Sequence, residues 1–187
     1  KGNVVSPDDL VRDYGCDSLR MYELFVGPPE LDAEWDDRGI DGVYRFLSRV
    51  WNLVQDSKEK QVEATKEMIK IRNKMVCDIT TRLENFSLNT VISGFMEYNN
   101  KLMELAKKEG GVDTETLSTL AVLLAPFAPH MAEELWEQLG HEGSVFHAGW
   151  PTYDEALMKD DEIEVAVQIN GKTRAVITVA ADVSKDD

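Results

Sequence analysis

The chain has 187 residues, of which 43% are hydrophobic, and its formal net charge at pH 7 is −15. This composition allows one ordinary domain, or one domain and part of another, and it excludes a wholly disordered chain. No apolar run approaches the ~18 residues of a membrane span, and no signal-peptide pattern is present, so we expect no membrane partner and a cytoplasmic location. Cys16 and Cys77 are expected to be free thiols.

The two ends suggest a segment of a longer protein. The chain begins with Lys1 rather than Met, and residues 184–187 have the pattern of a helix start with no helix after it. We therefore expect further sequence on both sides.

Two short helices are predicted at the N-terminal end. Residues 6–9, Ser-Pro-Asp-Asp, combine a capping hydroxyl, a first-turn proline and two carboxylates at the positive end of the helix dipole. Gly15 is expected to end this helix and Asp17 to begin the next, which ends before Gly27. Residues 30–41 are predicted to form an acidic loop packed down by Trp35.

Four longer helices are expected between residues 42 and 125, because apolar residues recur there at helical spacing. The second of them, from about residue 58 to 83, has an apolar stripe on one face and lysines on the other. Asp113 is expected to cap the fourth. The residues predicted to face the core are Val43, Phe46, Leu47, Val50, Val54, Ala64, Met68, Ile71, Met75, Ile79, Val91, Ile92, Phe95, Leu102 and Leu105.

Two prolines interrupt the apolar run that follows. Pro126 lacks an N–H, so we expect the chain to bend there, and Pro129 suits the first turn of a new helix that Gly140 ends. The residues around the joint are too apolar for an exposed hinge. We predict a buried elbow formed by Ala125, Phe127 and Ala128.

After Pro151 the apolar period changes from helical to alternating. Residues 163–169 and 173–179 read as strands on either side of Asn170-Gly171, which is a strong hairpin signal. An isolated hairpin is marginally stable in water, so this hairpin, at about residues 162–179, is expected to belong to a larger sheet.

No constellation of catalytic or metal-binding residues is evident. Glu34, Asp36 and Asp37 lie together without a nearby histidine or nucleophile, and are interpreted as a solvated acidic loop. His130 lacks the second histidine that a zinc helix requires. We therefore predict neither catalytic residues nor a metal site.

A positively charged helix face is the one candidate binding surface. Seven basic and four acidic residues lie between residues 58 and 82 of this acidic chain. Lys66, Lys70 and Lys74, here called the lysine ridge, could attract a polyanion. The alternative is a solvated helix face, because Glu63 and Glu67 each precede a ridge lysine by three residues.

Several stretches together resemble the bacterial-type leucyl-tRNA synthetases, which are class I enzymes. "KGNVVSPDDLVRDYGCDSLRMYELF" is similar to the segment after the family's KMSKS loop. "GPPELDAEWDDRGIDGVYRFLSRVWNLV" resembles the link into its helical domain, and "LLAPFAPHMAEELWEQLG" and "WPTYDEALM" resemble the end of that domain. "IEVAVQINGKTRAVITV" resembles the first hairpin of the C-terminal domain.

The resemblance implies a mainly α fold: a helical bundle of the class I anticodon-binding type with a short C-terminal β-hairpin. The implied domains are a stem-contact segment and link at 1–41, the bundle at 42–150, and a linker with the truncated start of the C-terminal domain at 151–187. The family's catalytic and editing domains, with ATP and Mg²⁺, would belong to the rest of the parent protein, and this chain would hold no cofactor.

The implied function is docking of leucine tRNA isoacceptors for ATP-dependent leucylation with editing. Contacts would reach phosphate and ribose rather than bases, and the candidate residues are Lys66, Lys70, Arg72 and Lys74. Two alternatives remain open. The chain could be the same region of a valyl- or isoleucyl-tRNA synthetase, or a free-standing helical module that binds an acidic protein.

Overall fold

The computed structural model describes residues 5–28, 31–32, 35–159, 162–169 and 172–180, and the chain is mainly helical. It divides into two compact units, Lys1–Tyr153 and Asp154–Asp187. The first unit contains α1 (Pro7–Tyr14), α2 (Cys16–Phe25), α3 (Asp37–Lys58), α4 (Lys66–Glu84), α5 (Leu88–Glu109), α6 (Thr114–Leu124), α7 (Pro129–Gln138) and the 3₁₀ turn η1 (Val145–His147).

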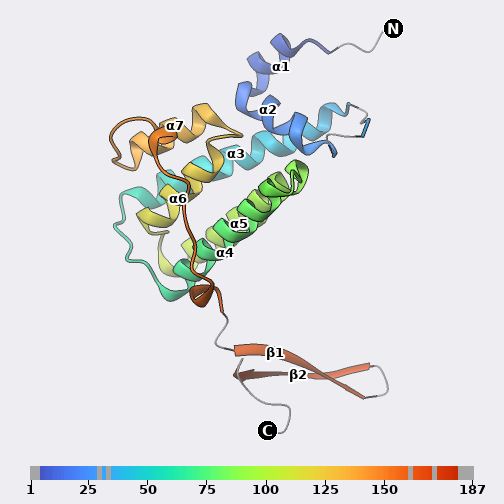
Figure 1. Ribbon diagram of the computed structural model, residues 1–187, viewed down its shortest axis with the longest axis vertical. Helices are drawn as coiled ribbons and strands as arrows, with labels where there is room; N and C mark the ends of the chain where they lie inside the picture. The colour runs from blue at the N-terminus through green and yellow to red at the C-terminus, as the bar shows by residue number, and fades with distance from the viewer. Residues whose placement is uncertain (1–4, 29–30, 33–34, 160–161, 170–171, 181–187) are drawn as a thin grey trace. The chain divides into compact units, whose positions relative to one another are not determined.

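The helices of the first unit pack as a bundle (Figure 1). α4 and α5 lie side by side as an antiparallel pair, and α3 packs against α5, α6 and α7. α2 contacts α3, α5 and α7, so it joins the N-terminal end of the chain to the bundle.

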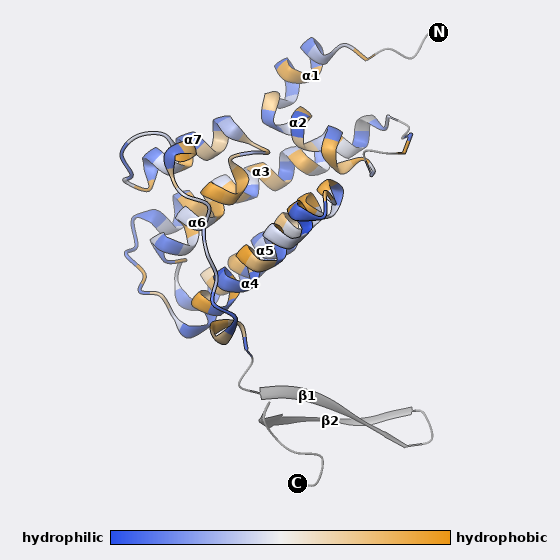
Figure 2. Ribbon diagram, in the orientation of Figure 1, coloured by the Kyte–Doolittle hydropathy of each residue, from blue (hydrophilic) through white to orange (hydrophobic). Residues whose placement is uncertain are grey.

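The predicted core is largely confirmed. Of the residues expected to face it, all except Ala64 are at least nine-tenths buried, and Phe46 and Phe95 are among the largest fully buried side chains. Figure 2 shows apolar residues along most of α6. That helix is enclosed because it packs against α3, α4 and α7.

The predicted acidic loop at 30–41 is wrong at its end, because α3 begins at Asp37 rather than near residue 42. Asp36 caps the helix: its Oδ1 accepts a hydrogen bond from the backbone N of Arg38 at 3.0 Å. Hydrogen bonds from the Arg38 side chain and backbone lower the pKa of Asp36. Ile40 is fully buried, so core packing favours the earlier start.

The predicted helix from residue 58 to 83 begins too early. α3 continues to Lys58, and α4 begins only at Lys66, where Thr65 Oγ1 accepts from the backbone N of Met68 at 3.3 Å. Gln61 has a φ of +46°, which no helix accommodates. Ala64 is consequently exposed in the link rather than buried in the stripe.

The buried elbow is confirmed: α6 ends at Leu124, just before Pro126, and the turn continues to Ala128. The backbone N of Ala128 still donates to Leu124 O at 2.8 Å, and Ala128 then leaves helical geometry with φ −127° and ψ 69°. A residue before proline is disfavoured in the α region, which fits the geometry of Ala128, and Pro129 occupies the first turn of α7. The ring of Phe127 packs edge-on against Phe95 of α5.

The second unit contains the 3₁₀ turn η2 (Glu155–Met158) and the strands β1 (Glu162–Ile169) and β2 (Lys172–Ala180). The strands pair antiparallel, with an irregularity between Val167 and Gln168. The predicted Asn170-Gly171 turn and the helix start at 184–187 lie outside the described residues. Within the described ranges, no helix is long and apolar enough to cross a membrane.

Candidate nucleic-acid interface

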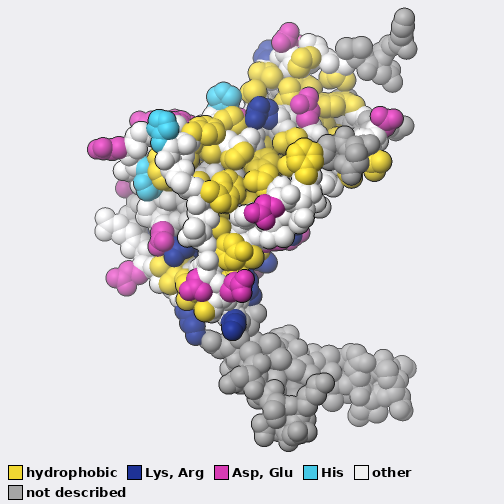
Figure 3. Space-filling model, viewed as in Figure 1, with side chains coloured by type: hydrophobic (Ala, Val, Ile, Leu, Met, Phe, Trp, Pro, Cys, Tyr) yellow, Lys and Arg dark blue, Asp and Glu magenta, His cyan; other side chains and the backbone are white. Residues whose placement is uncertain are grey.

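The lysine ridge lies along α4, where the spacing of four residues keeps its members on one side of the helix. Successive lysines are therefore about 6 Å apart along the helix axis. Lys66 is exposed in the first turn, and Lys70 and Lys74 are partly buried. Figure 3 shows Lys and Arg side chains gathered, on the face in view, at the end of the helical unit where α4 begins.

The ridge lysines also interact within the chain. Lys70 Nζ lies 2.5 Å from Glu67 Oε2, so these two residues, three apart on α4, form an ion pair. The backbone O of Lys74 accepts a hydrogen bond from the Tyr98 hydroxyl at 3.2 Å. A polyanion would therefore have to compete with Glu67 for Lys70, which makes the ridge a surface of modest charge.

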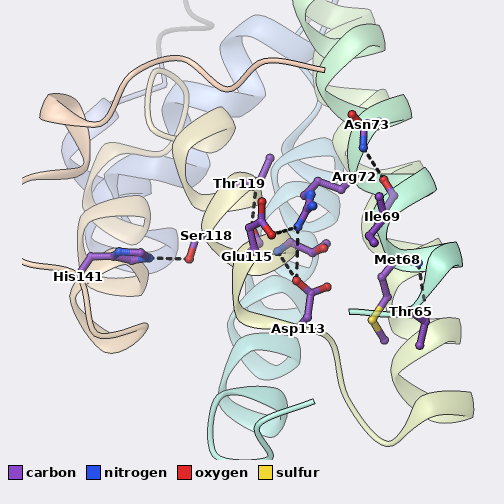
Figure 4. A network of polar contacts seen from close by, with 11 residues as sticks. Thr65, Met68, Ile69, Arg72, Asn73, Asp113, Glu115, Ser118, Thr119 and His141 are labelled. Carbon is purple, nitrogen blue, oxygen red and sulfur yellow. Dashed lines mark hydrogen bonds and ion pairs between the residues drawn. The ribbon is translucent and has the colours of Figure 1, made fainter. Parts of the chain in front are cut away.

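Arg72, the fourth predicted contact residue, faces a different neighbour. Its side chain is only 15% exposed, and its Nη1 lies 2.7 Å from Glu115 Oε2 and 3.6 Å from Asp113 Oδ1 (Figure 4). Asp113 Oδ1 also accepts from the backbone N of Thr116 at 2.9 Å, which caps α6 as predicted. Arg72 therefore joins α4 to the start of α6, and the structure does not bring it into the ridge.

The C-terminal part of α4 is fixed to α5 by a second polar group. Arg82 forms an ion pair with Asp78 at 2.8 Å and donates to the backbone O of Thr90 at 2.5 Å. Burial raises the pKa of the Tyr98 hydroxyl well above its usual range, and the negative charge of Asp78 adds to the rise. These contacts hold the helix that carries the ridge against its neighbour.

A second group of basic residues, which sequence reasoning missed, lines a hollow between α3 and α5. Arg49 comes from α3, Lys107 from α5, and Lys60 from the link between α3 and α4. The hollow has a volume of about 310 Å³. The three residues are far apart in sequence, and no short motif signals their proximity.

The acidic and histidine candidates have local roles. Asp36 caps α3, whereas Glu34 and the side chain of Asp37 lie outside what the structure describes. His130 Nδ1 donates to Asp17 Oδ1 at 2.8 Å in a single pair. Across the described ranges, no group of three or more His, Cys, Asp or Glu side chains is placed to hold a metal ion.

The family model for the anticodon-binding domain of tRNA ligase matches residues 65–186. The chain belongs to this family. The matched region begins at the cap of α4, and so contains the lysine ridge, the elbow and the described strands.

Two leucine–tRNA ligases match the whole chain. That of Fervidobacterium nodosum is 44% identical over an alignment of 203 positions, and that of Thermosipho melanesiensis is 42% identical over an alignment of the same length. Each match covers 100% of this chain and 25% of the relative. The chain therefore spans about a quarter of the length of these leucine–tRNA ligases.

A solved structure agrees at the level of the fold. A LeuRS from Agrobacterium radiobacter, in a ternary complex with tRNA and LeuAMS, matches with a TM-score of 0.83 and 30% sequence identity. The match covers 99% of this chain and 25% of that chain.

Proposed function

We propose that this chain is the tRNA-docking part of a leucyl-tRNA synthetase. The observation that carries this proposal is the 42–44% identity to leucine–tRNA ligases over the whole chain. Those names favour leucine over the valine and isoleucine alternatives. The tRNA in the Agrobacterium complex supports RNA, rather than an acidic protein, as the partner.

Docking would act by position rather than by chemistry. Leucylation with ATP and Mg²⁺, and editing, would be carried by other parts of a longer cytoplasmic protein. In such an enzyme, a domain that fixes the tRNA body contributes to the rate because a small misplacement of the acceptor end slows the reaction. The proposed division is a stem-contact segment at 1–41, the bundle at 42–150, and the start of a C-terminal domain at 151–187 that contains the hairpin.

The lysine ridge is the proposed contact surface. Its side chains present ammonium groups to phosphate and ribose oxygens, which fix the position of an RNA without reading its bases. Three observations support this choice: the helical spacing of the lysines, the exposure of Lys66, and the net positive charge of this stretch in a chain of net charge −15. Arg72 would contribute indirectly, by holding α4 against α6.

The test is a salt titration of binding to a leucine tRNA transcript. We compare the unsubstituted 187-residue chain with a triple variant in which Lys66, Lys70 and Lys74 are changed to Gln. If the ridge contacts phosphates, the plot of log affinity against log salt should lose a slope of about 2–3, because each contact contributes about 0.7–0.9.

The control is a second triple variant, with Arg45, Lys101 and Lys108 changed to Gln, which removes the same charge from exposed positions on α3 and α5. Equal slopes for the two triple variants would show that only net charge matters and would overturn the ridge assignment. Absence of tRNA binding by the unsubstituted chain would favour the alternative of a helical module that binds an acidic protein.

A further inference from the structure

The hollow between α3 and α5 has a regular construction. Arg49, Asn52, Leu53 and Asp56 follow one another at helical spacing and line it from α3. α5 supplies the opposite wall, and the link into α4 supplies Lys60. The remaining lining residues are Ser57, Met103, Ala106 and Lys107.

The walls of the hollow differ in chemistry. Leu53 is 5% exposed and belongs to the core, and Met103 and Ala106 pack against that core. Together these three side chains form an apolar floor. The charged lining residues Arg49, Asp56, Lys60 and Lys107 are all exposed, so they form a rim around it.

The rim carries three cations and one carboxylate, that of Asp56. Elsewhere in the bundle, cations of α4 are paired: Lys70 with Glu67 and Arg82 with Asp78. Within the described part of the chain, no ion pair or hydrogen bond engages the side chains of Arg49, Lys60 or Lys107. Three cations therefore face one hollow with a net positive charge.

The helix dipoles explain only part of this arrangement. Lys107 lies in the last turn of α5, where a cation is favoured by the negative end of the helix. Arg49 lies more than two turns before the end of α3, where the dipole has little effect. A cation at that position, facing two others, fits an anionic ligand.

We propose that this hollow binds the phosphate group of a nucleotide. Arg49 would supply a planar pair of N–H donors, and the two lysines would supply point charges, which is the usual way in which proteins hold phosphate. The apolar floor of Leu53, Met103 and Ala106 would contact the ribose or base, which inorganic phosphate lacks. With RNA as the source of that nucleotide the inference rests on the proposed function; the preference for a phosphate group does not.

The experiment uses the methyl groups of methionine as NMR probes. Met103 lies in the apolar floor of the hollow, and fully buried Met75 serves as the internal reference for an intact fold. Protein labelled at the methionine methyls is titrated separately with inorganic phosphate, AMP and a leucine tRNA transcript. We expect AMP and tRNA to shift the Met103 resonance, and inorganic phosphate to do so only at higher concentration.

Two variants test the rim. Changing Arg49, Lys60 and Lys107 together to Gln should weaken AMP binding at least tenfold, whereas the control change of Arg45, Lys101 and Lys108 should leave it within twofold. Asp56→Asn removes the one carboxylate and should tighten binding by about two- to fivefold, the order expected for a single charge contact at a surface. A merely structural role for the rim would not produce this gain.

The outcomes separate this inference from the proposed function. A Met103 resonance that no ligand moves, or that moves equally in both triple variants, overturns the nucleotide site. If tRNA binds the chain without moving Met103, RNA is excluded as the occupant while the proposed function stands. If AMP moves Met103 and tRNA does not bind at all, the proposed function fails and the hollow stands as a nucleotide site.

Discussion

Arg72 on α4 and Asp113 at the start of α6 lie with Nη1 and Oδ1 3.6 Å apart, and their side chains are only 15% and 5% exposed. Glu115 adds a second carboxylate on the solvent side, with its Oε2 2.7 Å from the same nitrogen of Arg72. Asp113 also caps α6, so the arginine holds the charge of a capping carboxylate inside the bundle. The contact positions α4, and with it the lysine ridge, relative to α6.

Replacement of Arg72 by Met should therefore reduce stability. The change keeps the length of the apolar stem but leaves Asp113 buried without its cation, so we expect the free energy of unfolding to fall by about 2–3 kcal/mol. Lys66→Gln, at an exposed position on the same helix, should change it by less than about 0.5 kcal/mol. Urea denaturation of both variants measures the difference, and equal midpoints would contradict a structural role for Arg72.

Asp17 gives a second prediction, because it caps a helix from a distance. Ala128 occupies the N-cap position of α7 and has no capping side chain, and the carboxylate of Asp17 on α2 accepts instead from the backbone N of Met131 at 2.8 Å. Asp17→Ala should lower the free energy of unfolding by about 1–2 kcal/mol. His130→Ala should lower the free energy of unfolding by less than Asp17→Ala does, because the His130 side chain is 73% exposed.

Thermal denaturation of Asp17→Ala, His130→Ala and Asp8→Ala tests whether Asp17 caps α7. Asp8 lies exposed in the first turn of α1, so its loss controls for removal of an acidic helix-start residue. A melting temperature of Asp17→Ala no lower than that of Asp8→Ala would rule out the cap.

The core could be predicted from the sequence because burial repeats with the period of the helix. Residues such as Phe46 and Phe95 lie on stripes that are visible without knowledge of any neighbour. The boundary between α3 and α4 could not be predicted, because residues 59–65 contain neither glycine nor proline. In the structure, the hydrogen bond from the backbone N of Met68 to Thr65 Oγ1 caps α4 and marks where it begins.

Long-range polar contacts were beyond prediction for another reason. Arg72 is two residues from Lys70 and Lys74, so helical spacing already separates it from the ridge, and only the packing of α6 against α4 shows which carboxylate it meets. The hollow beside Arg49 and Lys107 likewise exists only after α3 and α5 have packed together. Charge counting located the basic stretch but could not distinguish cations that hold the fold from those that face solvent.

The raised pKa of Tyr98 leads to a prediction about alkaline pH. Below pH 10.0, the ordinary phenol value, folded and unfolded chains both keep the proton, and the buried hydroxyl contributes its full stability. Above it, the unfolded chain loses the proton first and so binds fewer protons, and stability falls as pH rises. Tyr98→Phe should show a shallower fall between pH 9 and 11 in urea midpoints. Parallel curves for parent and variant would contradict the buried, protonated phenol.

Two glycines of α3 provide a matched pair for the last prediction. A Cβ at Gly39 would overlap the ring of Tyr22 and lie 2.7 Å from its hydroxyl oxygen, whereas nothing lies within 4 Å of a Cβ at Gly42. The Tyr22 hydroxyl donates to the backbone O of Asp36 at 2.7 Å and accepts from its backbone N at 3.2 Å. Displacement of the ring would break the contact that ties α2 to the start of α3.

Gly39→Ala should therefore lower the free energy of unfolding by about 1–3 kcal/mol, the usual cost of overpacking. Gly42→Ala should raise it by about 0.5–1 kcal/mol, because alanine is the better helix former and has room. Urea denaturation of the two variants measures changes of opposite sign from the same substitution on the same helix. Two stabilised variants would mean that Tyr22 can move aside, and that the early start of α3 does not depend on the fit of its ring over Gly39.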